Sequence, residues 1–337
     1  MSTATRGVAI LLGLLLLALL ALPWVIPIPE LRDTVPPASL ADPDSQFATA
    51  NDLRVHFKAA GEGEPAIILL HGFGASLFTW HAVLEPLAQS GSVIAYDRPA
   101  FGLTERPLPG TWQAESPYSA EAQVGLLLEM LDSQSIEQAV LVGNSAGAAI
   151  AVQAALEHPE RVLGLVLISP AVLDAGGPPG PAWLYRLPGI DRLGPLLARA
   201  FIGRGQALID LAWHDPGRIT PEIRQGYAKP LRADNWDVAL WELTRASQPL
   251  GLETRLSQVS VPTLVVTGAS DQIVLPEDSQ RVAELIPGAG WVVLPECGHL
   301  PQEECPQALL PVLQQFLDGI SNSFTRAAVA SKVEVLP

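Results

Sequence analysis

Short apolar runs alternate with segments of helical spacing along most of the chain. The apolar runs are four to eight residues long, which suits strands buried on both faces of a sheet. The predicted strands are 53–58, 66–70, 93–96, 139–142, 162–169, 263–267 and 291–294, and the predicted helices between and after them are 79–89, 121–131, 148–157, 279–285 and 307–317. Strands that alternate with helices in this way predict an α/β fold, with a mostly parallel sheet covered by helices on both faces.

The alternation fails between residues 174 and 256, where helical segments follow one another without a strand. This stretch carries the aromatic residues Trp183, Tyr185, Trp213, Tyr227, Trp236 and Trp241. We predict a helical lid over 175–256, inserted between two parts of the α/β core at 47–174 and 257–319 and facing the carboxyl ends of the strands. The alternative is a helical subdomain that packs most of these aromatic rings in a core of its own.

The amino-terminal run 7–22 contains no charged residue and is just long enough to cross a bilayer core. We interpret 1–28 as an uncleaved signal anchor, with a cleaved signal peptide as the alternative. Because Arg6 precedes the run, the folded part is expected on the non-cytoplasmic side of a membrane. Residues 29–46 are then a proline-bearing linker, and 320–337 a loose carboxyl-terminal tail.

Charge and cysteine content exclude several function classes. The 337 residues carry 20 Lys and Arg against 35 Asp and Glu, a formal net charge of −15, so nucleic acid is not an expected partner. A neutral or apolar substrate suits this surface better than an anionic one. Cys297 and Cys305 are expected to be free buried thiols, with pairing as the alternative, and no spacing suggests a zinc site.

The pentapeptide 143–147, Gly-Asn-Ser-Ala-Gly, stands between a predicted strand and a helix of small residues. A G-x-S-x-G sequence in this context is a nucleophile elbow, in which a strained turn exposes the serine hydroxyl. Glycine two residues before and after the serine leaves room for the neighbouring backbone. Ser145 is therefore the candidate nucleophile.

A serine nucleophile needs a base and a group that orients the base. His299 follows the last predicted strand, and Asp271 follows the strand before it, so both should lie at the carboxyl edge of the sheet. Asp174 is the alternative acid. The glutamates near His299, which are Glu296, Glu303 and Glu304, are expected to be solvated.

The loop His71-Gly72-Phe73-Gly74 follows another predicted strand. Its glycines allow the backbone amide of Phe73 to point, together with that of Ala146, at one oxygen atom. Two such donors form an oxyanion hole. His71 is expected to hold the loop by hydrogen bonding and to take no part in proton transfer.

These motifs together resemble those of the α/β-hydrolase superfamily, in its esterase, lipase and C–C hydrolase members. The matching segments are HGFG at 71–74, DRPAFGLTERP at 97–107, GNSAG at 143–147, GASDQIV at 268–274 and GHLPQEE at 298–304. The resemblance implies Ser145 as nucleophile, His299 as base, Asp271 as its orienting acid, and no metal or organic cofactor. Epoxide hydrolases and haloalkane dehalogenases are similar but carry aspartate at the elbow, so the serine argues against both.

We therefore expect a serine hydrolase that cleaves a carboxylic ester with an apolar acyl or alcohol part. The first alternative is a C–C bond hydrolase of meta-cleavage type, which calls for polar or basic lid residues such as Arg186, Arg192, Arg199 or Arg204 near the pocket. The second is a slowly turning over ligand receptor on the same fold. The elbow motif does not separate them, because the lid selects the substrate.

Overall fold

The computed structural model describes residues 5, 7, 10, 21–113, 115–173 and 182–332 and is built around one eight-stranded sheet. The strand order is β1-β2-β4-β3-β5-β6-β7-β8. Strands β1 and β2 pair antiparallel, β2 pairs antiparallel with β4, and all other neighbours are parallel. The strands are β1 (Gln46–Ala50), β2 (Leu53–Ala60), β3 (Ala66–Leu70), β4 (Ser92–Tyr96), β5 (Ala139–Asn144), β6 (Val162–Ile168), β7 (Thr263–Gly268) and β8 (Gly290–Leu294). The predicted mostly parallel sheet is confirmed.

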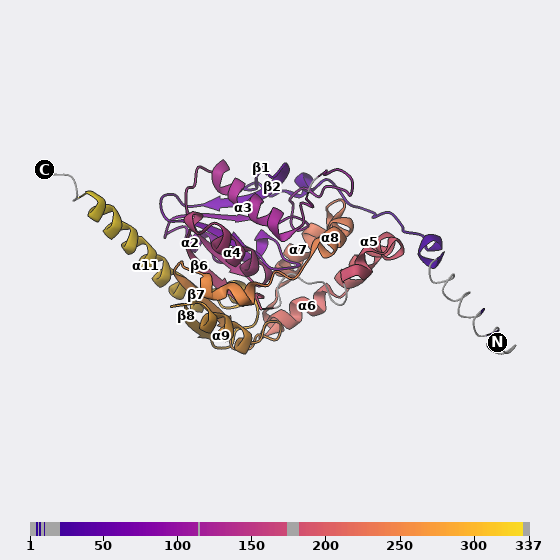
Figure 1. The fold of residues 1–337 in the computed structure, drawn as a ribbon. Helices are drawn as coiled ribbons and strands as arrows, with labels where there is room; N and C mark the ends of the chain where they lie inside the picture. Colours follow the sequence, from indigo (N-terminus) through magenta and orange to yellow (C-terminus); the bar gives the residue numbers. More distant parts are fainter. Residues whose placement is uncertain are drawn as a thin grey trace.

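The central strands are apolar throughout because helices cover both faces of the sheet (Figure 1). In β3, Ile68 and Leu70 belong to one hydrophobic cluster, whereas Ile67 and Leu69 belong to the cluster on the opposite face. The first cluster is closed by α3 (Ala120–Ser133), α4 (Ala146–Glu157) and α9 (Pro276–Leu285), and the second by α2 (Leu84–Leu87) and α11 (Pro306–Lys332). Helix α3 begins where the Ser119 hydroxyl accepts a hydrogen bond from the amide of Ala122 at 3.0 Å.

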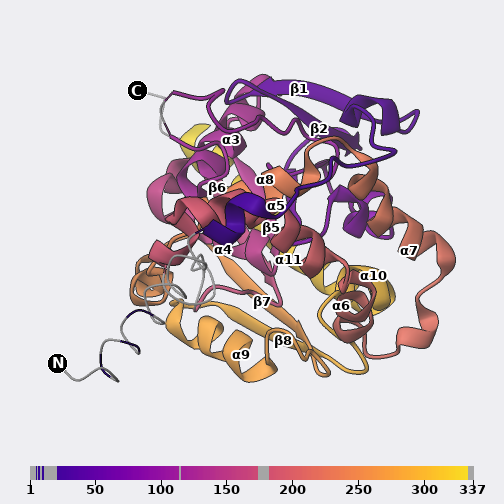
Figure 2. The same ribbon diagram turned by 90° about the vertical axis from the view of Figure 1, so that its right-hand side faces the viewer.

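Between β6 and β7, the described part of the chain, residues 182–258, adds no strand to the sheet, and we call it the helical insertion. Its α-helices are α5 (Pro188–Ile202), α6 (Gly205–Ala212), α7 (Pro221–Ala228) and α8 (Trp236–Ala246), and its short 3-10 helices are Ala182–Arg186, Pro216–Arg218, Lys229–Arg232 and Leu252–Gln258. Figure 2 shows α5 and α8 in front of the central strands. Asp174, the alternative acid, lies outside the described residues.

The prediction of a single-pass membrane location is wrong. Within the described ranges, no helix is long and apolar enough to cross a membrane. Most of the apolar run 7–22 lies outside these ranges. The described helical residues before the core, 21–25, end ahead of Pro27 and Pro29.

The segment that follows these helical residues packs along α5 of the helical insertion. Nη1 of Arg192 donates to the carbonyl of Ile26 at 2.8 Å, and Nη1 of Arg199 donates to the carbonyl of Pro29 at 2.7 Å. Further along, Val35 pairs with Ala233 in an isolated bridge. The predicted linker 29–46 is therefore held against the insertion over part of its length.

Residues 320–337 were expected to form a loose tail, but α11 continues to Lys332. After Gly319 the chain contains no glycine or proline before Pro337. Adding residues to an existing helix needs no new nucleation, so the packed first half of α11 supports its extension. Figure 1 shows the carboxyl-terminal half of α11 projecting from the body, away from the helical insertion.

Candidate active site

Ser145 lies on the sharp turn between β5 and α4. Its φ of 53° is a left-handed value that a residue with a side chain rarely adopts, and its amide donates to the carbonyl of Ile168 at 2.9 Å. A Cβ atom on Gly143 would lie 2.6 Å from the amide nitrogen of Ala148, and one on Gly147 would meet the backbone that follows β3. The two glycines are thus required by the close approach of neighbouring backbone.

His299 and Asp271 form a buried hydrogen-bonded pair. Nδ1 of His299 lies 2.8 Å from Oδ2 of Asp271, and the two residues are 5% and 3% exposed. The second carboxylate oxygen accepts the amides of Ile273 at 2.8 Å and Val274 at 3.0 Å. These two bonds fix the position of the Asp271 carboxyl group. Because it faces Nδ1 of His299, the tautomer with its proton on Nδ1 is favoured, and Nε2 is left as the acceptor nitrogen.

Asn144 connects the elbow to the loop that carries His299. Its Nδ2 donates to the carbonyl oxygens of His299 and Ile168, both at 3.2 Å. Among the described residues, the hydroxyl of Ser145 has no hydrogen-bond partner and can turn freely. The structure thus brings His299 and Asp271 into contact and places Ser145 beside the His299 loop.

The loop after β3 passes close to the elbow, since a Cβ on Gly72 would lie 3.1 Å from Cβ of Ser145. Nδ1 of His71 donates to the carbonyl of Gly72 at 2.8 Å, while its Nε2 accepts the amide of Arg98 at 3.0 Å. Burial, and next the positive charge of Arg98, lower the pKa of His71 to about 4, so the ring stays neutral. His71 therefore holds the loop, as predicted. In the described parts of the chain the amides of Phe73 and Ala146 are not engaged by another acceptor.

A cavity of about 710 Å³ lies between the elbow and the helical insertion. The core contributes Phe73 and Ala146 to its wall, and the insertion contributes mostly apolar side chains. Those from the insertion include Tyr185, Leu197, Phe201, Leu240, Trp241 and Leu243. Two charged residues line the cavity in the described structure, the buried Arg98 and the exposed Asp278. No insertion arginine whose side chain the structure describes lines it.

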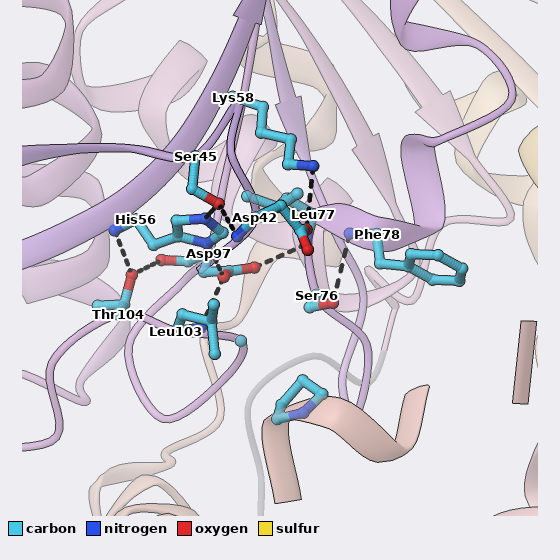
Figure 3. A network of polar contacts seen from close by, with 12 residues as sticks. Asp42, Ser45, His56, Lys58, Ser76, Leu77, Phe78, Asp97, Leu103 and Thr104 are labelled. Atoms are coloured by element: carbon cyan, nitrogen blue, oxygen red, sulfur yellow. Dashed lines mark hydrogen bonds and ion pairs between the residues drawn. The ribbon is translucent and has the colours of Figure 1, made fainter. Parts of the chain in front are cut away.

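A second Ser-His-Asp arrangement lies away from this cavity (Figure 3). Nδ1 of His56 is 2.6 Å from Oδ2 of Asp97, and Nε2 of His56 is 2.7 Å from Oγ of Ser45. Asp97 also accepts the amides of Leu77 and Leu103, both at 2.7 Å. Ser45 lines none of the three main cavities of the described structure. This array, which was not predicted from the sequence, fastens the segment before β1 to β2 and to the loop after β4.

Glu304 was expected to be solvated, but it is completely buried and ties the His299 loop to the helical insertion. Its carboxylate accepts the amides of Gly298 at 2.7 Å, His214 at 2.9 Å and Asp215 at 2.8 Å. The amide of His299 donates to the carbonyl of Ala212 in the same insertion at 2.7 Å. The expectation failed because two of the three amide partners of Glu304 lie 89 and 90 residues away in the sequence, which no local pattern reveals.

Glu303 was also expected to be solvated and is 7% exposed. One carboxyl oxygen accepts the hydroxyls of Thr79 and Tyr227, whereas the other has no partner among the described residues. Burial raises the pKa of Glu303 to about 7, against the lowering effect of the two hydroxyls. A carboxyl group between core and insertion therefore titrates near neutral pH.

Glu303 should make the protein less stable as the pH rises from about 4.5 to about 7. In this window the unfolded chain releases the proton of Glu303 while the folded chain retains it, so ionisation favours unfolding. The shift corresponds to about 3 kcal/mol in the free energy of unfolding. Urea unfolding of wild type and Glu303→Gln across this range should show wild type losing about that amount relative to the variant. A difference that does not vary with pH contradicts the assignment.

Cys297 and Cys305 are paired in a disulfide, contrary to the expectation of free thiols. The short helix α10 (Pro301–Glu304) turns the chain back between them, so their Cα atoms lie 6.2 Å apart, within the range of a disulfide. The pair closes the loop that carries His299. In the ranges that the structure describes, no group of three His, Cys, Asp or Glu side chains is placed to hold a metal ion.

The chain matches one family model and is similar to two curated relatives and one solved structure. The family model for the alpha/beta hydrolase fold matches residues 65–306. A 2-hydroxy-6-oxononadienedioate/2-hydroxy-6-oxononatrienedioate hydrolase of Comamonas testosteroni is 30% identical, over 81% of this chain and 96% of its own. A 2-hydroxymuconate semialdehyde hydrolase of Pseudomonas sp. is 31% identical, over 80% of this chain and 92% of its own.

Among solved structures, a membrane phospholipase A characterised as a bacterial virulence factor is similar with a TM-score of 0.65 and 25% identity. The match covers 96% of this chain and 100% of that protein. The family model spans more than half of the chain, and its range contains the elbow, the His299–Asp271 pair and the helical insertion. The chain therefore belongs to the alpha/beta hydrolase fold family.

Proposed function

We propose that the protein is a serine hydrolase that cleaves carboxylic esters with an apolar acyl or alcohol part. The observation that carries this proposal is the buried His299–Asp271 pair beside an elbow serine with a free hydroxyl. Hydrolases of this family place a nucleophile, a base and an orienting acid at the carboxyl edge of the sheet. We assign these three roles to Ser145, His299 and Asp271, in that order.

In the proposed reaction, Nε2 of His299 takes the proton of Ser145 as its oxygen attacks the ester carbonyl. The amides of Phe73 and Ala146 stabilise the oxyanion of the tetrahedral intermediate. The protonated His299 then donates its proton to the leaving alcohol, which leaves an acyl-enzyme. Water, deprotonated by His299, attacks the acyl carbon and releases the acid and Ser145.

The lining of the cavity supports an ester with an apolar part. The described side chains that the insertion supplies include leucines, Phe201 and Trp241, and none of them is basic. Arg199, for example, bonds to Asp237 at 2.7 Å instead. The similar phospholipase A also supports the proposal, since a phospholipase A cleaves a carboxylic ester.

The second candidate is hydrolysis of a C–C bond in a ring-fission product. The two curated relatives favour it over ester cleavage, since both act on substrates of this class. In this reaction His299 takes the proton of Ser145 as the serine oxygen attacks the ketone or aldehyde carbonyl. The C–C bond then breaks, the leaving carbon takes the proton from His299, and water hydrolyses the acyl-enzyme. The two candidates therefore share the site and differ in the leaving group.

One set of assays separates the candidates. Purified protein is incubated with p-nitrophenyl esters of increasing chain length and, separately, with 2-hydroxymuconate semialdehyde, whose loss is followed by absorbance. Ester turnover that exceeds semialdehyde turnover in kcat/KM by about a hundredfold or more supports the first candidate. The reverse order supports the second, and turnover of neither substrate class overturns both.

A further inference from the structure

Arg98 is a buried cation in the wall of the main cavity. It follows β4 directly, is 4% exposed, and lines the same cavity as Phe73 and Ala146, whose amides form the proposed oxyanion hole. Its guanidinium lies 5.7 Å from the centre of the Phe101 ring. The charge is therefore held close to the reacting region and away from bulk solvent.

The hydrogen bonds of Arg98 go to neutral groups. Its Nε donates to Oε1 of Gln123 at 2.9 Å, and its Nη1 donates to the carbonyl of His71 at 2.7 Å. Nη2 has no acceptor among the described residues. The neighbouring carboxylate of Asp97 is already engaged by His56 and by two backbone amides. Among the described residues Arg98 thus has no carboxylate counterion, and it keeps donors to spare.

A buried charge without a counterion is costly, and an anion that enters the cavity offsets that cost. Burial lowers the pKa of Arg98 to about 10, which still leaves the guanidinium charged at neutral pH. The other charged residue of the lining, Asp278, is exposed and lies on α9. An arginine with free donors matches a carboxylate, which can accept two parallel hydrogen bonds.

We propose that Arg98 forms a carboxylate subsite, so that preferred substrates carry a free carboxylate in addition to the bond attacked by Ser145. This inference rests on the proposed function of the same cavity and narrows its substrates to acid-bearing esters, such as monoesters of dicarboxylic acids. It departs from the expectation of a neutral substrate that the net charge of −15 suggested. The local cation, rather than the overall charge, decides which group can be bound.

The test compares esters of equal length with and without a carboxylate. The pairs are monoethyl adipate with ethyl hexanoate, and monoethyl suberate with ethyl octanoate. Wild type should prefer the acid-bearing ester in kcat/KM by about ten- to a hundredfold, the range of a hydrogen bond to a charged group. Arg98→Gln should abolish this preference, Arg98→Lys should retain part of it, and Asp278→Asn should preserve it. Any effect of Arg98→Gln on the His71 loop should change kcat/KM for both esters alike, so it cancels in the ratio of the two kcat/KM values.

Calorimetry with Ser145→Ala separates the subsite from the reaction. This variant should bind monoethyl suberate at least about tenfold more tightly than ethyl octanoate, and adding Arg98→Gln should remove the difference. If Ser145→Ala shows this difference in binding but wild type hydrolyses neither ester, the proposed function is overturned and the subsite is supported. Turnover by wild type with no preference for the acid-bearing ester, or a preference that survives Arg98→Gln, overturns the subsite and leaves the function standing.

Discussion

Ser145→Ala is expected to abolish covalent labelling by a fluorophosphonate probe and to lower kcat for the best substrate by about 10⁴- to 10⁶-fold. The reason is that alanine removes the attacking oxygen, while the strained turn and its two glycines remain. The activity that is left should come from substrate binding and from the amides of Phe73 and Ala146. Labelling is read by intact mass, and kcat by ester turnover at saturating substrate.

Ser45→Ala is the matched control, because Ser45 also lies within hydrogen-bond distance of a histidine that contacts an aspartate. Ala146, which follows Ser145, lines the main cavity together with Phe73, whereas neither Ser45 nor its chain neighbours line a main cavity of the described structure. Labelling and kcat should therefore stay within about twofold of wild type. Loss of labelling in Ser45→Ala, with labelling retained in Ser145→Ala, would reverse the assignment of the nucleophile.

The sheet and the elbow could be predicted because their signals are local. A strand such as β3, buried on both faces, must be apolar at every position, and Ser145 on its strained turn needs glycine on either side. His299 and Asp271 could be placed because parallel strands end at one edge of the sheet. Their contact at 2.8 Å follows from that topology.

Features that depend on distant partners could not be predicted. Glu303 and Glu304 have the sequence pattern of a solvated helix end, yet hydroxyls and amides from the helical insertion surround them. Likewise, the sequence indicates only that Arg98 lies in a loop. Its position in the cavity wall depends on the path of the His71 loop. The extension of α11 was missed although Ile320, Phe324 and Ala328 keep a helical spacing and nothing in the sequence before Pro337 stops a helix.

Asp271→Asn is expected to lower kcat by about 10³- to 10⁴-fold with little change in KM. The amide of asparagine can donate to Nδ1 of His299, which favours the tautomer with its proton on Nε2 and leaves no base facing Ser145. The amides of Ile273 and Val274 can still bond to the asparagine oxygen, so the loop should keep its shape. The variant should fold with a melting temperature near that of wild type, so the loss appears in kcat measured with ester substrates.

Asp174→Asn tests the alternative acid with the same chemical change. Asp174 follows β6, whereas Asp271 follows β7 and holds the imidazole of His299 directly. If the tautomer of His299 is what sets the rate, only Asp271→Asn should lose activity, and its loss should not be recovered by raising the pH. If Asp174→Asn loses activity and Asp271→Asn keeps it, Asp174 is the orienting acid, and the His299–Asp271 contact is structural rather than catalytic.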